Sequence, residues 1–402
     1  MTREIALLGR LIRTGTLDLE LPDGARHRFG RGQPCVRWSI SGPGSLRRIL
    51  ADPDLMLGET YMRGEWRAEP GQLAELMTLL MRNAGELAGH VGRFTRLPGL
   101  FLQQLNRVRA SYRNVAHHYD LDEWLFRRFL DADLHYSCAY FPVPGLDLET
   151  AQRAKADHIA VKLCLAPGMR VLDIGCGWGS LALHLAKHYD VAVTGLTLSA
   201  RQLGVAQRAA VERGLADRVR FVLQDYRQHD GRYDRIVSVG MFEHVGRPYY
   251  PTFFRRLAAG LDRGGVALLH TICRQGPPGV TNPWVRKYIF PGGYNPALSE
   301  LTDGVEHSLL KITDIELLRR HYALTLNAWQ ARFQQHRIAI AERMGERFCR
   351  MWEFYLAASE AAFATGGLAV AQVQLATDQD AVPLTRDYLY RPVMARPMRR
   401  AG

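Results

Sequence analysis

The sequence predicts an α/β domain with a mostly parallel sheet, preceded by a small α+β unit. From about residue 120 onward, short apolar runs alternate with segments of helical period. One of these runs ends in a glycine-rich turn that leads into a helical segment. Residues 1–90 lack this alternation and combine short strand patterns with an amphipathic helix. Strands that alternate with helices form βαβ units, which place ligands at the carboxyl ends of parallel strands.

The composition is that of a globular protein. The chain has 402 residues, of which 47% are hydrophobic and 23% charged, and this argues against a disordered or collagen-like chain. No apolar run approaches the roughly 20 residues that span a bilayer, and the N-terminus does not resemble a signal peptide. Six cysteines form no C-x-x-C pair. We therefore expect reduced thiols in a cytoplasmic protein.

The charge is positive and unevenly distributed. The formal net charge is +12, and residues 1–113 carry half of it, with 17 arginines, no lysine and 11 acidic residues. Such an excess favours an anionic partner, either nucleic acid, anionic lipid or an acidic small molecule. A basic chain can also have no such partner. Residues 87–119 contain five arginines, three histidines and no acid. They predict either an amphipathic segment on an anionic membrane or a linker helix against a neighbouring domain.

The N-terminal unit shows three kinds of pattern. Residues 1–41 predict short strands, because Leu17, Leu19 and Leu21 alternate with acidic residues and residues 36–40 also alternate. A helical period begins after Gly44, and a longer helix is expected over residues 72–87.

The second part of the chain predicts five strands and several helices. The expected strands are 171–174, 191–196, 219–223, 235–239 and 266–270. Helices are expected over 180–188, 200–213 and most of 316–363. Their alternation predicts the parallel sheet.

The glycine-rich turn carries most of the functional information. Residues 171–179 read Val-Leu-Asp-Ile-Gly-Cys-Gly-Trp-Gly, a strand that runs into a loop in which glycines allow close approach to a ligand. No G-K-[ST] follows, which excludes a P-loop, and G-x-G-x-G differs from the dinucleotide fingerprint. The pattern D-x-G-x-G-x-G resembles the first loop of S-adenosylmethionine-dependent methyltransferases. The candidates for cofactor binding here are Asp173, Gly175, Cys176, Gly177 and Gly179.

Polar residues after the next two strands fit the same ligand. Thr197, Ser199 and Gln202 follow the second strand and could bind ribose hydroxyls. Asp225 and Tyr226 follow the third, where a carboxylate can accept from an adenine amino group and a ring can stack on the base. If no ligand binds there, the residues after each strand would simply form a polar loop.

Several motifs converge on one family. They are His118-Tyr119-Asp120-Leu121, Tyr136-Ser137-Cys138-Ala139-Tyr140-Phe141, Phe242-Glu243-His244-Val245-Gly246, Leu269-His270-Thr271-Ile272, residues 287–293 and His321-Tyr322-Ala323. In this order they resemble the cyclopropane-fatty-acyl-phospholipid synthases and the related mycolic acid cyclopropane synthases. The resemblance covers most of residues 114–365, and residues 58–66 resemble the extra domain of the phospholipid-acting members.

The resemblance implies a Rossmann-like class I methyltransferase domain with a mostly parallel seven-stranded sheet. The family transfers the methyl of S-adenosylmethionine to a cis double bond, and bicarbonate then removes a proton from the resulting cation so that the ring closes. The residues matching its bicarbonate site are Cys138, Glu243, His270, Tyr322 and the backbone of Ile272. Tyr136 and Ser137 match further cofactor contacts. Taken singly, these residues would more often be core or packing residues.

One residue departs from the family pattern. Ser359 stands where many members carry an active-site cysteine, and this difference concerns the substrate channel rather than the methyl transfer. A hydride shift in the cation would give a methyl- or methylene-branched chain instead of a ring. A catalytically inactive homologue that binds lipid is a third possibility.

The resemblance and the charge together suggest an organisation. We expect a lipid-associated domain over residues 1–90, a basic linker over 91–113 and the methyltransferase domain over 114–402. The expected partners are unsaturated phospholipid acyl chains and an anionic membrane surface, with no nucleic acid, no metal and a possible homodimer. The protein is then cytoplasmic and peripheral to the inner face of the membrane.

Overall fold

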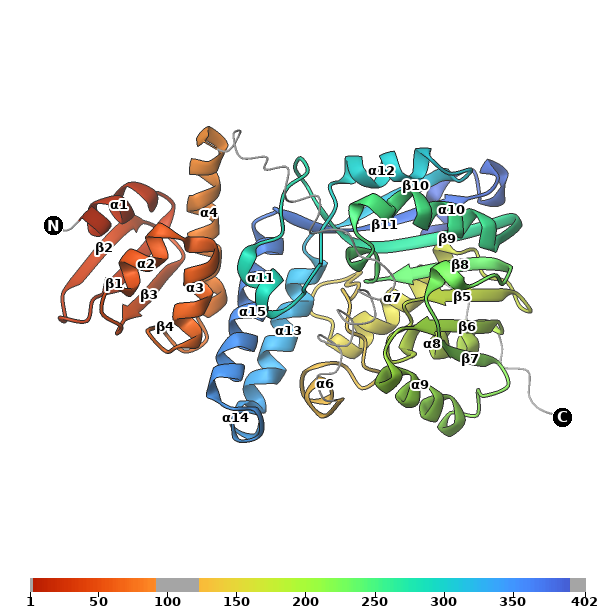
Figure 1. Ribbon diagram of the computed structural model, residues 1–402, viewed down its shortest axis with the longest axis horizontal. Coiled ribbons are helices and arrows are strands. Elements are labelled where there is room, and N and C mark those ends of the chain that lie inside the picture. The colour runs from red at the N-terminus through yellow and green to blue at the C-terminus, as the bar shows by residue number, and fades with distance from the viewer. Residues whose placement is uncertain (1–2, 92–122, 391–402) are drawn as a thin grey trace.

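The computed structural model describes residues 3–91 and 123–390, and it contains two α/β units (Figure 1). Most of the predicted basic linker and the His118–Leu121 motif lie outside the described residues. The smaller unit holds the N-terminal elements and the larger unit holds the rest (Figure 1).

The N-terminal unit is a four-stranded sheet with helices. Its elements are α1 (Arg3–Leu11), β1 (Gly15–Glu20), β2 (Arg26–Arg31), β3 (Cys35–Ile40), α2 (Ser45–Ala51), α3 (Pro53–Met62), β4 (Trp66–Ala68) and α4 (Leu73–Val91). The strand order is β2-β1-β3-β4. Strands β1 and β3 are parallel, and the other two neighbouring pairs are antiparallel. The alternation seen in the sequence is reproduced in β1, where the buried Leu17 and Leu19 alternate with the half-buried Asp18 and Glu20.

The prediction of strands throughout residues 1–41 is wrong at the N-terminus. Residues 3–11 form helix α1, because Ile5, Leu8 and Ile12 repeat at intervals of three and four and are all buried. The expected helix over 72–87 is confirmed as α4, which begins at Leu73 and ends at Val91.

The larger unit contains a seven-stranded sheet of order β10-β11-β9-β8-β5-β6-β7. Its strands are β5 (Arg170–Ile174), β6 (Ala192–Thr197), β7 (Val219–Leu223), β8 (Tyr233–Val239), β9 (Leu261–Arg274), β10 (Lys311–Leu318) and β11 (Leu368–Ala376). The five strands β9-β8-β5-β6-β7 are parallel, and β11 and β10 add antiparallel pairs at one edge. The predicted fold class is confirmed.

Helices cover both faces of this sheet. The helices of the unit are α6 (Glu123–Phe129), α7 (Leu148–Lys162), α8 (Ser180–Tyr189), α9 (Ala200–Glu212), α10 (Tyr250–Gly260), α11 (Pro283–Tyr288), α12 (Leu298–Glu306), α13 (His321–Gln335), α14 (Arg337–Met344) and α15 (Glu346–Ala364). Val171 of β5 packs in one apolar cluster with residues of α7, α8 and α9. Its neighbour Leu172 packs in another cluster with residues of α10 and α12. Successive strand residues point to opposite faces, so the sheet is a buried central layer.

The expectation of helix from residue 316 is wrong for its first residues. Residues 311–318 form the edge strand β10, which pairs with β11, and helix begins only at His321. The half-buried, charge-containing pattern of an edge strand is hard to tell from an amphipathic helix over eight residues.

The two units pack directly against each other (Figure 1). Helices α3 and α4 lie on α15, and α3 also contacts α11. Glu59 of α3 accepts hydrogen bonds from Lys287 Nζ at 2.6 Å and from the Tyr288 hydroxyl at 3.0 Å. Gly58 leaves room for the ring of the buried Trp284. In the part of the chain that the structure describes, no helix is long and apolar enough to cross a membrane.

Candidate functional site

The glycine-rich loop joins β5 to α8 at the carboxyl edge of the parallel sheet. Gly175 has a φ of +83°, and a Cβ there would lie 2.7 Å from the Cβ of Met241. Gly179 has a φ of +87°, and a Cβ there would lie 2.6 Å from the ring of Phe221. Both positions therefore require glycine. Gly179 offers no side-chain cap to α8, so the first backbone N–H groups of that helix remain available to a ligand.

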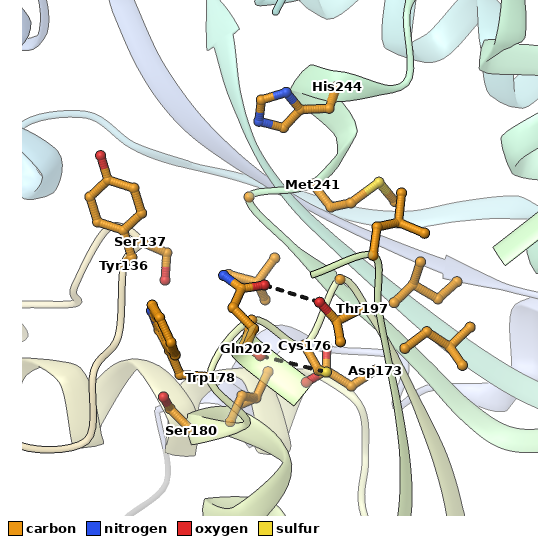
Figure 2. Close-up of a pocket in the computed structure, with 18 of the residues that line it drawn as sticks. Tyr136, Ser137, Asp173, Cys176, Trp178, Ser180, Thr197, Gln202, Met241 and His244 are labelled. Carbon is orange, nitrogen blue, oxygen red and sulfur yellow. Dashed lines mark hydrogen bonds between the residues drawn. The ribbon is translucent and has the colours of Figure 1, made fainter. Parts of the chain in front are cut away.

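A pocket lies over the carboxyl ends of β5, β6, β7 and β8 (Figure 2). Ten of the eleven predicted cofactor-binding residues line it, namely Tyr136, Ser137, Asp173, Gly175, Cys176, Gly177, Thr197, Gln202, Asp225 and Tyr226. The eleventh, Gly179, lies behind the wall, where it allows α8 to pack closely against β7. One cavity thus collects residues that are spread over 90 positions of the sequence, and their binding role stays a prediction.

Asp173 is a buried acid at the base of the pocket. Its side chain is 1% exposed and its Oδ2 has no hydrogen-bond partner among the described residues. Burial raises the pKa of Asp173 to about 7, and the nearby Lys155 ammonium opposes that rise. A buried polar atom without a partner is costly. A cationic or donor group of a ligand would satisfy it.

The turn after β6 presents an amide to the same pocket. The Thr197 hydroxyl donates to Gln202 Oε1 at 3.0 Å, as the dashed line in Figure 2 shows. Ser199 begins α9, where its hydroxyl oxygen accepts from the backbone N–H of Gln202 at 3.2 Å. These bonds fix the Gln202 side chain and leave its Nε2 as a donor to a ligand.

The turn after β7 is held by an ion pair. Both carboxylate oxygens of Asp225 accept from the Arg227 guanidinium, at 2.9 and 2.7 Å. The same guanidinium lies 5.6 Å from the centre of the Tyr226 ring. Asp225 is thus oriented before any ligand is bound, and its oxygens retain lone pairs for a further donor.

A second group of predicted residues lies beside this pocket. Glu243 is 8% exposed and lies between Met241 and His244, which line the pocket wall (Figure 2). Its Oε1 accepts from the backbone N–H of Ile272 at 2.6 Å, and its Oε2 has no partner among the described residues. Burial raises the pKa of Glu243. The carboxyl group therefore occupies the Ile272 donor that the family resemblance assigned to bicarbonate.

His270 and Cys138 are both held in their neutral forms. His270 lies on β9 opposite Gln372 of β11, with 3.2 Å between Gln372 Nε2 and His270 Nδ1. Burial, and then the charge of Lys155, lower the pKa of His270 well below its ordinary value. Burial raises the pKa of the fully buried Cys138, whose thiol donates to the carbonyl of Ala139 at 3.3 Å. Cys138 is therefore a thiol rather than a nucleophilic thiolate.

Tyr322 and Ser359 lie on the two long helices that flank this region. Tyr322 is half-buried on α13, and its ring centre lies 4.7 Å from that of Phe363 on α15. One turn further along α13, the Thr325 hydroxyl accepts from the backbone N–H of Ala139, which ties this helix to the segment after Cys138. Ser359 is half-buried on α15. Among the five predicted catalytic residues, a direct hydrogen bond joins Glu243 and Ile272.

Several pocket residues were not identified from the sequence. They are Lys155, His135, Trp178, Met241, His244 and Arg227. Burial lowers the pKa of His244 to about 4, so it is neutral at physiological pH. A signal existed for Lys155, because Lys155 and Lys162 share the helix face of the apolar Ile159 and both are buried. Lysines on the apolar face of a helix indicate buried charge.

Comparison with known proteins shows what the chain resembles. The family model of mycolic acid cyclopropane synthetase matches residues 106–373, and a domain of unknown function, DUF7884, matches residues 7–90. Cyclopropane-fatty-acyl-phospholipid synthase of Escherichia coli K12 is 40% identical over 83% of this chain and 86% of its own length. Tuberculostearic acid methyltransferase UfaA1 of Mycobacterium tuberculosis is 37% identical over 83% of this chain and 81% of its own.

Solved structures agree with these matches. The mycolic acid cyclopropane synthase CmaA1, solved with SAH and CTAB, is 35% identical, with a TM-score of 0.63 over 66% of this chain and 98% of its own. Coclaurine N-methyltransferase, at 20% identity and a TM-score of 0.65, shares the fold.

Proposed function

Because this chain belongs to the mycolic acid cyclopropane synthetase family, we propose that it converts cis double bonds of phospholipid acyl chains into cyclopropane rings. It is an S-adenosylmethionine-dependent methyltransferase with a class I methyltransferase fold. The observation that carries the choice of substrate is the match to the Escherichia coli phospholipid synthase, which covers 83% of this chain. The match to cyclopropane mycolic acid synthase 1 of Mycobacterium tuberculosis covers 61% of it.

The pocket residues suit the cofactor. S-adenosylmethionine supplies the methyl group when it is bound. The orphan oxygen of Asp173 and the open N–H groups at the start of α8 fit its polar groups. We assign the ribose to Thr197 and Gln202 and the adenine to Asp225 and Tyr226. An alkene is a weak nucleophile, so this fixed geometry must supply much of the rate, up to about 7–11 kcal/mol from positioning alone.

We propose that a small anion, bicarbonate, is the base and that Cys138, Glu243, His270 and Tyr322 surround it. A buried anion needs hydrogen-bond donors to offset its lost hydration. Neutral His270 and the Tyr322 hydroxyl can each donate one, whereas the Cys138 thiol already donates to the carbonyl of Ala139. Glu243 can take part if it shares a proton with the anion, since burial raises its pKa and its Oε2 is otherwise without a partner among the described residues.

The N-terminal part suits contact with an anionic membrane. We propose that residues 1–90 form a lipid-associated domain, residues 91–113 a basic linker and residues 114–402 the catalytic domain, in a cytoplasmic protein that visits the inner membrane surface. The support is the arginine excess before residue 114, because anionic lipid attracts such residues by about 1 kcal/mol each. A homodimer is compatible with this arrangement.

The test is a reaction with liposomes. The protein is incubated with S-adenosylmethionine and vesicles of a cis-monounsaturated phosphatidylglycerol, and the acyl chains are released and analysed by mass spectrometry and proton NMR. We expect each product chain to gain one CH₂ unit and to lose its olefinic protons. Absence of any mass gain, from protein that binds S-adenosylhomocysteine, would overturn the proposed activity.

A second outcome is favoured by one specific relative. UfaA1 is named a tuberculostearic acid methyltransferase and covers as much of this chain as the Escherichia coli enzyme does. If the cation shifts a hydride and loses a different proton, the chain becomes methyl- or methylene-branched. In the same NMR spectrum, a methylene-branched chain would show the protons of a =CH₂ group, and a methyl-branched chain would show a methyl doublet. Either signal without cyclopropyl signals would identify that activity. Ser359 is a candidate for influencing this choice, because it stands where many members of the family carry a cysteine.

A further inference from the structure

One charged residue of the cofactor pocket has no role so far. Lys155 lies on α7, is 1% exposed, and lines the pocket together with Ser137 and Asp173. Its ammonium donates to the Ser137 hydroxyl at 2.9 Å. We propose that Lys155 binds the α-carboxylate in the methionine part of S-adenosylmethionine.

The first argument is the unbalanced charge. Among the described residues, no carboxylate lies within ion-pair distance of the Lys155 ammonium, and Ser137 is its one hydrogen-bond partner. Lys162, seven residues further along α7 and equally buried, donates to Glu316 at 2.5 Å. An ammonium has three N–H donors, and burying it without an anionic partner is expensive. Lys155 thus lacks the partner that its neighbour on the same helix has.

The nearby acids do not supply that partner. Both oxygens of Asp131 already accept from His135, one from its backbone N–H at 2.9 Å and one in contact with its ring at 2.8 Å. Asp173 is close enough to influence Lys155 electrostatically but is not in contact with it. Burial lowers the pKa of Lys155 to about 8, so the group is still mainly cationic at physiological pH. The pocket therefore contains one unpaired cation and one acid with an orphan oxygen.

An amino acid zwitterion complements this pair. The α-ammonium of the methionine part can donate toward Asp173, and its α-carboxylate can accept from Lys155 and Ser137. Charge-assisted bonds of this kind are roughly twice as strong as neutral ones. Binding would satisfy the orphan oxygen of Asp173 and the spare donors of Lys155 together.

The position of Lys155 along the pocket agrees with this. The adenosine candidates Thr197, Gln202 and Asp225 follow β6 and β7 at one end of the sheet. Lys155 contacts Ser137, which lies beside Gly240 at the end of β8, on the other side of β5. An extended cofactor with its adenosine over β6 and β7 would place its amino acid part at β5 and β8, next to Lys155.

The experiment uses two ligands that differ in the amino acid part. Binding of S-adenosylhomocysteine and of methylthioadenosine, which lacks the amino acid, is measured by isothermal titration calorimetry for the wild type and for Lys155→Met. The matched control is Lys187→Met, which replaces an exposed lysine on α8. We expect Lys155→Met to weaken S-adenosylhomocysteine by about 10- to 100-fold, the range for a hydrogen bond to a charged group, and to leave methylthioadenosine unchanged.

Three results would overturn the proposal. Equal weakening of both ligands would mean that Lys155 only maintains the shape of the pocket, and unchanged affinity for both would mean that it does not touch the cofactor. A variant that binds S-adenosylhomocysteine normally but needs more bicarbonate for turnover would assign Lys155 to the anion site and also overturn it. Neither titration contains lipid. The outcome of both therefore does not depend on which acyl product the enzyme makes.

Discussion

Replacement of Glu243 by glutamine tests the proposed chemistry most directly. Glutamine keeps an oxygen to accept the Ile272 N–H and an NH₂ group to donate, but it cannot share a proton with a bound anion. If hydrogen bonding alone were needed, the variant would be active. If Glu243 shares or moves a proton, as its buried and otherwise unpartnered Oε2 indicates, turnover should fall by about 10²- to 10⁴-fold. That loss corresponds to about 3–5 kcal/mol in the barrier.

The fold should tolerate this change. A hydrogen bond to a charged acceptor contributes about 1.5–3 kcal/mol and a neutral one about 0.5–1.5. The Ile272 bond therefore weakens by about 1 kcal/mol, and removal of a buried carboxylate offsets part of that. Burial raises the pKa of Glu243 above its ordinary value of 4.5, so the stability it contributes is present at acidic pH and is lost as the pH rises through the raised pKa. The variant should accordingly gain stability relative to the wild type as the pH increases above 4.5.

The assay measures release of S-adenosylhomocysteine with unsaturated vesicles, alongside calorimetric binding of S-adenosylhomocysteine. Glu300→Gln is the control, because Glu300 is also buried and also accepts a backbone N–H, from Ala297 at 2.9 Å, but it does not line the pocket. We expect Glu243→Gln to lose turnover and keep its cofactor affinity, while Glu300→Gln keeps both. Wild-type turnover in Glu243→Gln would refute the proton-sharing role.

Two further predictions concern stability. Glu316→Gln leaves the fully buried Lys162 without its 2.5 Å partner, and urea unfolding at pH 7 should show a loss of about 3–5 kcal/mol. Against the effect of burial, the hydrogen bond with His158 and the charge of Lys162 lower the pKa of Glu316 from 4.5 to about 2. This difference in stability should therefore shrink as the pH falls from 4.5 to 2, and a constant difference would contradict it. Gly58→Ala places a Cβ 2.4 Å from Nε1 of the buried Trp284, whereas a Cβ at Gly276 meets nothing within 4 Å. Thermal unfolding should show a lower Tm for Gly58→Ala only, with a cost of about 1–3 kcal/mol for overpacking, and equal Tm values would refute the interface packing.

The sequence predicts the position of the cofactor pocket well because of how parallel sheets are built. Their carboxyl ends meet at one edge, so residues that follow successive strands must lie near one another. Asp173, Thr197 and Asp225 come from three strands and line one cavity. No knowledge of side-chain packing is needed for that inference.

Elements decided by tertiary context are harder to predict. Helix α1 contains only two buried residues, Ile5 and Leu8, and the alternation of the residues that follow it favours a strand. Strand β10 carries charged residues, is paired on one side only and is half-buried over most of its length, so its sequence does not distinguish it from an amphipathic helix. In both cases too few residues are buried for the sequence to establish the period of a buried face.

Partnerships within the site are also decided by packing. The sequence motifs place Glu243 and Ile272 in the site but do not indicate that one bonds the other, since this depends on how residues 242–244 meet β9. Lys155 is not indicated by the sequence because it lies on a helix rather than after a strand, although it lines the pocket and donates to Ser137. Such contacts follow from three-dimensional register and not from spacing in the chain.

The two halves of the site differ in charge, and this difference fits the proposed reaction. The cofactor pocket holds Asp173 and Lys155, opposite charges suited to a zwitterion. In the second cluster, burial favours the neutral forms of Glu243, His270 and Cys138 alike. Uncharged donors can hold an anion by hydrogen bonds, and a site that excludes water protects a carbocation from reaction with it. The residues proposed for the cofactor therefore carry opposite charges, while those proposed for the anion are neutral donors.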